Sequence, residues 1–272
     1  MSTGTHAAAG AGFPAAFVAR CLDDALASRA RVYGISGLQG SGKSTLAAQV
    51  ARLAGERGIR AAVLSLDDCY LDHDERARLA RDVHPLLATR GPPGTHDMAL
   101  ATQTLDALRA GDPVALPRFD KLADGKRPVS DWPRVEDVEL ALFEGWFLGT
   151  PAEPADALAE PVNALERVED PDGRWRRWCN DALGRDYPVL WARIDRLMLL
   201  QAPGFDIVPR WRWQQEQSLQ AEQPDRHAMT RAQVERFVQF FERTSRQALR
   251  TLPGIADATV ALDARRRPVS RT

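Results

Sequence analysis

The sequence has few cysteines, no long apolar run and almost no net charge. Cys21, Cys69 and Cys179 are scattered and odd in number, without a C-x-x-C pair, so they indicate neither a disulfide framework nor a zinc site. This pattern suits a reducing environment, and we expect a cytoplasmic protein. No apolar stretch approaches the ~20 residues that a membrane span requires. A formal net charge of −1 over 272 residues disfavours binding to nucleic acid or to a membrane surface.

The N-terminus also lacks the charged start and apolar core of a signal peptide. We expect residues 1–12 to form a disordered tail and residues 1–272 to form a single domain. Proline, alanine and acidic residues are enriched over 150–172, which indicates an exposed start to a helical insertion at 150–192. A long helix at 205–225 is expected to act as a lid, and the basic tail from Arg265 is expected to be loose. We expect a monomer.

Residues 32–46 have the order of a buried strand, a glycine-rich turn and a helix. Positions 37–44 match G-x-x-x-x-G-K-[ST], the phosphate-binding P-loop. The glycines let several backbone N–H groups point at one anion, and the start of the helix adds its dipole. Lys43 can reach the β- and γ-phosphates, and the Ser44 hydroxyl can ligate Mg²⁺. The predicted nucleotide-binding residues are Gly37, Leu38, Gln39, Gly40, Ser41, Gly42, Lys43, Ser44 and Thr45.

Four further apolar runs alternate with helical patterns, at 61–66, 138–143, 196–201 and 258–262. This alternation predicts a three-layer α/β/α fold of the P-loop NTPase type, with a mainly parallel central sheet. Ligands of such sheets bind beyond the carboxyl ends of the strands. Asp67, Asp68 and Glu144 each follow a predicted strand, so we expect them to meet the P-loop in one crevice.

Phosphoryl transfer needs phosphate charge neutralisation, a metal ion and a group that orients and deprotonates the attacking hydroxyl. We assign the last role to Asp67, which Asp68 could share, or Asp68 could hold a metal-bound water. Glu144 has the placement of a Walker-B acid, so the predicted metal site comprises Ser44, Asp67 and Glu144. Two alternatives stay open: Asp67 could cap a helix that begins near Asp72, and Glu144 could be a sheet-edge carboxylate paired with an arginine.

Two loops, at 90–97 and 117–126, mix cations with polar acceptors, which suits a small anionic substrate that carries a hydroxyl. Each of these side chains could instead be an ordinary surface charge. Arg210 and Arg212 lie two apart on a predicted helix and do not share a face, so one can reach the nucleotide phosphates while the other pairs elsewhere. The predicted substrate-binding residues are Tyr70, Arg90, His96, Asp97, Arg118, Asp120 and Lys121.

Taken in order, these motifs resemble the D-glycerate 3-kinase family, within the phosphoribulokinase and uridine kinase group of P-loop kinases. The resemblance implies phosphorylation of a D-glycerate hydroxyl by ATP and Mg²⁺ to give 3-phosphoglycerate, with Asp67 as the catalytic acid and a lid near Arg210 and Arg212. Alternatives are a kinase of the same group that acts on a nucleoside, pantothenate or another sugar acid, and a P-loop ATPase that is not a kinase. The matching segments are 37–45, 65–71, 90–97, 117–121, 142–149 and 210–216.

Overall fold

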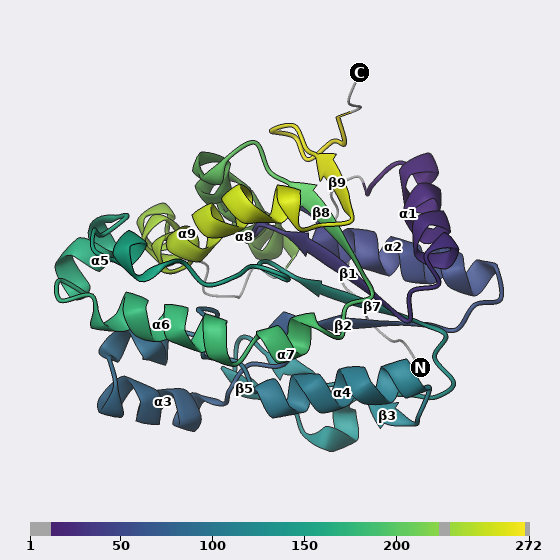
Figure 1. Ribbon diagram of the computed structural model, residues 1–272, viewed down its shortest axis with the longest axis horizontal. Helices are drawn as coiled ribbons and strands as arrows, with labels where there is room; N and C mark the ends of the chain where they lie inside the picture. The colour runs from purple at the N-terminus through teal and green to yellow at the C-terminus, as the bar shows by residue number, and fades with distance from the viewer. Residues whose placement is uncertain (1–11, 223–228, 270–272) are drawn as a thin grey trace.

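The central element of the fold is a five-stranded parallel sheet. The computed structural model describes residues 12–222 and 229–269. The strand order is β2-β7-β1-β8-β9, and every neighbouring pair is parallel, which confirms the predicted α/β class (Figure 1). The strands are β1 (Val32–Gly37), β2 (Ala61–Ser65), β7 (Leu140–Gly145), β8 (Arg196–Gln201) and β9 (Ala258–Ala261).

The strands are apolar on both sides because helices cover both faces of the sheet. Successive side chains of a strand point to opposite faces, so Leu142 enters one hydrophobic core and Phe143 the other. The helices at 15–27 and 43–56 supply residues to the first core, and those at 98–110, 174–185 and 188–191 supply residues to the second. The helix at 231–251 contributes to both. The result is the predicted three-layer arrangement.

The helices begin and end close to the sequence-based expectations. Helix α2 begins at Lys43, directly after the glycine-rich turn, and α9 begins with the predicted capping box of Thr230 and Gln233. The helices are α1 (Ala15–Ala27), α2 (Lys43–Glu56), α3 (His73–Asp82), α4 (Met98–Ala110), α5 (Ala164–Glu169), α6 (Arg174–Arg185), α7 (Pro188–Trp191), α8 (Val208–Glu222) and α9 (Arg231–Thr251). Two small antiparallel ribbons pair β3 (Val114–Ala115) with β6 (Arg134–Val135) and β4 (Phe119–Asp120) with β5 (Gly125–Lys126).

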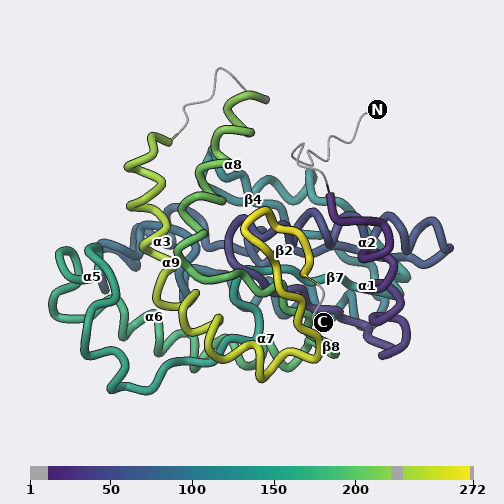
Figure 2. The backbone as a smooth tube through the Cα atoms, turned by 90° about the horizontal axis from the view of Figure 1, so that it is seen from above, coloured from purple at the N-terminus to yellow at the C-terminus, as the bar shows by residue number. Residues whose placement is uncertain are grey.

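The helix expected at 205–225 is split into a short 3₁₀ turn, η5 (Phe205–Ile207), and α8. Residues 223–225 of that prediction lie outside the described residues. Figure 2 shows α8 and the start of α9 running side by side away from the body of the sheet. No helix within the described ranges is both long and apolar enough to cross a membrane.

Two further expectations concern the segments at the two ends of the chain. The expected disordered tail, 1–12, lies outside the described residues except for Gly12. The expectation of a loose basic tail from Arg265 is wrong as far as residue 269. The Asp263 carboxylate accepts hydrogen bonds from the backbone N–H groups of Arg265 and Arg267, and Leu262 pairs with Pro268. Local hydrogen bonds to a turn aspartate therefore order this segment.

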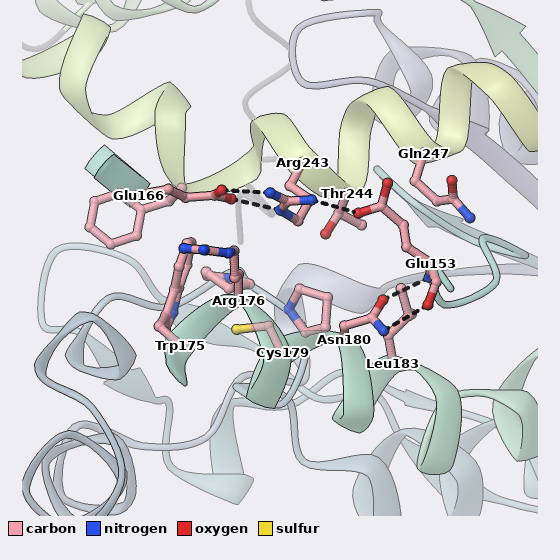
Figure 3. A pocket seen from close by; sticks show the side chains of 13 residues that line it. Glu153, Glu166, Trp175, Arg176, Cys179, Asn180, Leu183, Arg243, Thr244 and Gln247 are labelled. Atoms are coloured by element: carbon pink, nitrogen blue, oxygen red, sulfur yellow. Dashed lines mark hydrogen bonds and ion pairs between the residues drawn. The ribbon is translucent and has the colours of Figure 1, made fainter. Parts of the chain in front are cut away.

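The segment at 150–192 contains α5, α6 and α7, and its first part is less exposed than expected. Leu158, Leu165, Glu166 and Asp170 are buried. The guanidinium of Arg243, on α9, donates to both carboxylate oxygens of Glu166 at 2.9 and 2.7 Å (Figure 3). Glu153, Glu166 and Asp170 are therefore buried in ion pairs, whereas the other acidic residues of 150–172 are exposed as expected: Asp156, Glu160, Glu169 and Asp172.

Arg243, Glu153 and Glu166 form one buried cluster, called the Arg243 cluster, in which every guanidinium nitrogen donates a hydrogen bond. The same guanidinium donates to Glu153 at 3.2 Å and to the backbone carbonyls of Ala157 and Glu160. A cavity of ≈20 Å³, room for about one water molecule, lies between α6 and α9 beside this cluster. None of the predicted site residues lines it. The cluster therefore ties the 150–192 segment to α9 and is not part of the predicted active site.

We expect Arg243→Met to lower the free energy of unfolding by about 3–5 kcal/mol, because it leaves Glu166 buried without its cation and leaves Glu153 with Arg250 alone. The measurement is the denaturant midpoint followed by circular dichroism. The matched control is Arg231→Met on the same helix, where the arginine is 77% exposed and pairs with Glu235. That variant should lose no more than about 0.5 kcal/mol. Equal losses in the two variants would contradict the structural role of the buried cluster.

Candidate active site

The turn between β1 and α2 forms a nest of backbone N–H groups. Gly40 and Gly42 adopt left-handed conformations, with φ of +77° and +93°. A Cβ on Gly40 would lie 2.7 Å from the Cβ of Trp211, so only glycine lets α8 approach the turn. Lys43 is the first residue of α2, where the helix dipole is positive. This geometry can bind the phosphates of a nucleotide.

Glu144 lies beside this nest. It occupies the penultimate position of β7 rather than following the strand, because the ladder to β1 continues to Gly145. The Ser44 hydroxyl donates to Glu144 Oε1 at 2.9 Å, and Oε2 is buried with no hydrogen-bond partner in the part of the chain that the structure describes. The alternative of a sheet-edge carboxylate paired with an arginine is wrong, since β7 lies between β2 and β1 and the recorded partner is Ser44.

Asp67 lies just beyond β2, in the 3₁₀ turn η1 (Leu66–Asp68). Lys121 Nζ donates to its Oδ2 at 2.8 Å. Within 12–222 and 229–269, Oδ1 is buried and makes no hydrogen bond of normal geometry, although the Tyr70 side chain lies near enough to act on the pKa of this carboxyl. Burial alone would raise the pKa of this carboxyl, but the charges of Lys121 and Lys43 hold it well below its usual range. The helix-cap alternative is wrong, because Asp72 caps α3. Asp67 is therefore an ionised carboxylate, and it lies close enough to Lys43 for the ammonium charge to lower its pKa.

Asp68 has a different environment. Its Oδ1 accepts the backbone N–H of Phe119 at 3.1 Å, and Arg118 lies 3.4 Å from Oδ2. Burial raises the pKa of Asp68, although the Phe119 hydrogen bond and the Arg118 charge oppose the rise. Both oxygens therefore have partners in the loop that follows β3. The two adjacent aspartates thus differ, since Asp67 pairs with Lys121 and interacts with the Tyr70 side chain, whereas Asp68 binds Phe119 and Arg118.

An aromatic cluster lies next to Asp67. The rings of Tyr70 and His96 are 4.8 Å apart, and their backbones form an antiparallel bridge. Phe119 lies against Tyr70, and the Arg90 guanidinium is 5.8 Å from the Phe119 ring centre. Arg90 also donates to Asp124 at 2.5 Å. The structure therefore brings four of the seven predicted substrate residues together: Tyr70, Arg90, His96 and Lys121.

The other three predicted substrate residues have partners in the protein. Asp97 caps α4 and accepts a 2.7 Å hydrogen bond from Lys126. Asp120 Oδ1 accepts the N–H groups of Leu122 and Ala123, so it stabilises the β4–β5 turn. Arg118 contacts Asp68, as described above, and the Pro117 carbonyl. Each has a structural role that the spacing of the motifs did not reveal.

The two lid arginines are not equivalent. Arg212 pairs with Glu216 at 3.2 Å and lies over the Phe237 ring, which links α8 to α9. Arg210 is exposed and close enough to Arg266 for its charge to act there. Burial, reinforced by Arg210, lowers the pKa of Arg266. The expectation that only one of the pair stays available to a nucleotide therefore rests on Arg210.

Sequence reasoning missed Arg266. Its Nε donates to the Gly40 carbonyl at 2.5 Å, and its Nη2 donates to the Trp211 carbonyl at 3.3 Å. The guanidinium also lies 5.3 Å from the Trp211 ring centre. This residue therefore joins the C-terminal turn, the P-loop and the first turn of α8. No local pattern signals it, because the contact to Gly40 spans 226 positions.

The donor set around the nest suits a hard cation held mainly by a bound phosphate. Across 12–222 and 229–269, no group of three or more His, Cys, Asp or Glu side chains could hold a metal ion by itself. Mg²⁺ in kinase sites uses one or two carboxylates together with phosphate oxygens and water. The unpartnered oxygens of Glu144 and Asp67 meet that requirement. The residues present therefore fit Mg²⁺ as a companion of a nucleotide.

Comparisons with known proteins agree with this geometry, although no family model matches the chain. A Schizosaccharomyces pombe protein described as the uncharacterized kinase mug58 is 35% identical over 206 residues, 70% of this chain and 71% of that protein. The chloroplastic D-glycerate 3-kinase of Arabidopsis thaliana is 34% identical over 197 residues, which is 68% of this chain but only 41% of the plant enzyme.

A solved structure extends the likeness to the whole fold. D-glycerate 3-kinase from Cryptococcus neoformans var. grubii superposes with a TM-score of 0.75 at 27% identity, covering 94% of this chain and 96% of that one. A structure titled YGR205w protein gives 0.71 at 26% identity, with 94% of each chain covered. Kinases of this fold use ATP, typically with Mg²⁺. The chain therefore belongs to the D-glycerate 3-kinase family of uridine kinase-like P-loop kinases, and it is an ATP-dependent kinase.

Proposed function

We propose that this kinase transfers the γ-phosphate of ATP to a hydroxyl of D-glycerate and releases 3-phosphoglycerate. Two relatives whose names state this activity support the substrate, one by sequence and one by structure. The observation that carries the chemistry is the Asp67 carboxylate, which is ionised, close to Lys43 and, within the described ranges, has no hydrogen bond of normal geometry at Oδ1. A free carboxylate beside a phosphate nest can accept the proton of an attacking alcohol.

The nucleotide would lie on the nest between β1 and α2. Backbone N–H groups of residues 37–44 and the Lys43 ammonium would neutralise the β- and γ-phosphates, with Arg210 above them. Ser44, Glu144 and Asp67 would hold Mg²⁺, which supplies positive charge to the transferring phosphoryl group. In the structure the Ser44 hydroxyl donates to Glu144. With Mg²⁺ bound, the same oxygen would serve as a metal ligand.

The acceptor would lie between Asp67 and the aromatic cluster. Lys121 already reaches Asp67, so its ammonium is in place to bind an anionic acceptor next to the base. Arg90 would add a second positive charge, and Tyr70 and His96 would form the wall behind it. Asp68 and Arg118 would hold the loop that carries Lys121, through Phe119. Asp97 and Asp120 would hold the walls of this pocket in place. Asp97 accepts a hydrogen bond from Lys126, and Asp120 accepts one from the β4–β5 turn.

We expect ADP release from ATP and Mg²⁺ to be stimulated by D-glycerate, and by L-glycerate, uridine, pantothenate and gluconate to a much smaller extent. Stereochemical selection follows if the acceptor carboxylate and the attacking hydroxyl are both held in place. The measurement is coupled ADP release over this panel, with ³¹P NMR to identify the phosphorylated position. Lys43→Ala, prepared in the same way, controls for contaminating kinases.

Three outcomes would contradict the proposal. Stimulation by uridine, pantothenate or gluconate without stimulation by D-glycerate would keep the kinase but change its acceptor. Rapid ADP release that no acceptor increases would instead favour ATP hydrolysis as the function. A 2-phosphoglycerate product would show that the acceptor binds in the reverse orientation.

A further inference from the structure

Among the described residues, His96 is a buried histidine with one ring nitrogen that has no hydrogen-bond partner. It lies in the loop before α4, is 4% exposed, and contacts the rings of Tyr70, Phe147 and Tyr187. Its Nδ1 is 2.6 Å from the Tyr187 hydroxyl, whereas its Nε2 is buried without a hydrogen-bond partner. A buried polar atom left unpaired is costly, so it indicates either a ligand or strain.

The hydrogen bonds around Tyr187 determine which nitrogen carries the proton. The Tyr187 oxygen accepts the backbone N–H of Gly94 at 2.9 Å. The side chain of Tyr187 is completely buried, and in the described part of the chain His96 Nδ1 is the only acceptor recorded for its hydroxyl hydrogen. The hydroxyl therefore donates to Nδ1. Since Nδ1 accepts, the proton of a neutral imidazole must lie on Nε2.

The imidazole is neutral at physiological pH. Burial lowers the pKa of His96 to about 4, although the Asp67 charge acts in the opposite direction. The influence of Asp67 also shows that the ring lies within the electrostatic reach of that carboxylate. The Nε2–H group is therefore an uncharged donor in the neighbourhood of Asp67, the residue that would deprotonate the acceptor.

We propose that Tyr187 is a positioning residue that holds His96 in the Nε2–H tautomer, and that this N–H donates a hydrogen bond to an oxygen atom of a small hydroxy-acid acceptor. The second half rests on the proposed function, because it places the acceptor beside Asp67. An uncharged N–H donor can orient a hydroxyl or carboxylate oxygen of the acceptor without forming an ion pair with Asp67. The residue that receives this role, Tyr187, lies 91 positions after His96 and outside every motif that the sequence presents.

The tautomer can be observed in the full-length chain without turnover. We expect the histidine side-chain ¹⁵N spectrum at pH 7 to show a protonated Nε2 and an unprotonated Nδ1 for His96. His96→Gln identifies the signal, and Tyr187→Phe should produce a mixture of both tautomers because Nδ1 loses its donor. A proton on Nδ1 in the unsubstituted chain, or a doubly protonated ring, would overturn the assignment.

The acceptor contact is tested by kinetics. His96→Phe should raise the KM for the acceptor about tenfold, the effect of one lost hydrogen bond. Tyr187→Phe should raise it about twofold, because about half of the rings would still present Nε2–H, and should leave the KM for ATP unchanged. The matched control is Tyr33→Phe, which also removes a buried hydroxyl, one that donates to Asp24. His96→Gln keeps a side-chain N–H donor and should retain more acceptor affinity than His96→Phe.

The kinetic measurement and the nitrogen spectrum test different halves of the proposal. An acceptor KM that rises no more in Tyr187→Phe than in Tyr33→Phe would overturn the contact, as would equal losses in His96→Gln and His96→Phe. If no acceptor in the panel is phosphorylated, the proposed function fails and the contact with it. The nitrogen spectrum would still decide whether Tyr187 sets the tautomer.

Discussion

Replacing Asp67 by asparagine is expected to lower kcat by about 10²–10⁴, the range for loss of a general base. The KM for ATP should change much less, because the nest and Lys43 remain. The amide keeps the size of the carboxylate but cannot accept a proton, and it cannot pair with Lys121 as a charge. Steady-state kinetics with saturating D-glycerate and Mg²⁺ measure both parameters.

Asp68→Asn is the matched control, because the two aspartates are neighbours. Its carboxylate binds Phe119 and Arg118, so we expect a loss of stability and a modest change in KM for the acceptor rather than a large loss of kcat. Activity close to that of the unsubstituted chain in Asp67→Asn would remove Asp67 from the role of base. If Asp68→Asn then showed the large loss of kcat, the role would pass to Asp68.

Lys43→Ala is expected to lower kcat by about 10²–10³ and to raise the KM for ATP. The ammonium at the start of α2 is a positive charge aimed at the nucleotide phosphates, and charge stabilisation of this kind has that magnitude. A second effect follows from the structure: the pKa of Asp67 should rise when this charge is removed. Nucleotide titration and steady-state kinetics separate weaker binding from slower transfer.

Arg52→Ala provides the control for Lys43→Ala. It removes a cation from the same helix, but its guanidinium is exposed and pairs with Glu56 one turn further on. We expect its kinetic constants to stay within twofold of those of the unsubstituted chain, since exposed pairs contribute little. Equal losses in the two variants would mean that Lys43 acts on the stability of α2 and not on the nucleotide.

The sheet and the P-loop could be predicted because their signals are local. The apolar run at 32–36, the glycines and the start of the following helix lie within fifteen residues, and each physical requirement appears in the residue type itself. The same holds for the capping box of α9. The boundaries were less certain: β7 continues to Gly145, so Glu144 lies within the strand. The ladder to β1, a non-local interaction, decides where β7 ends.

The aspartate pair shows where local reasoning reaches its limit. Asp67 and Asp68 are the same residue type at adjacent positions, and spacing alone left the choice of base open. Their environments differ because Lys121 and Phe119, more than fifty positions away, approach Asp67 and Asp68 respectively. Arg118, Asp97 and Asp120 likewise look like ligands in the sequence and have structural partners in the fold.

The amino-acid order alone determined the class of fold, the nucleotide nest and the edge of the sheet at which the acids gather. Periodicity and glycine placement encode those features over short distances, so they can be read without coordinates. Only the tertiary structure decided that Asp67 pairs with Lys121 while Asp68 binds Phe119, that Arg266 joins the last turn to the P-loop, and that Tyr187 contacts His96. Those contacts join segments that are far apart in the sequence and that packing brings together. The residues around each partner in the sequence therefore contain no pattern that predicts the contact.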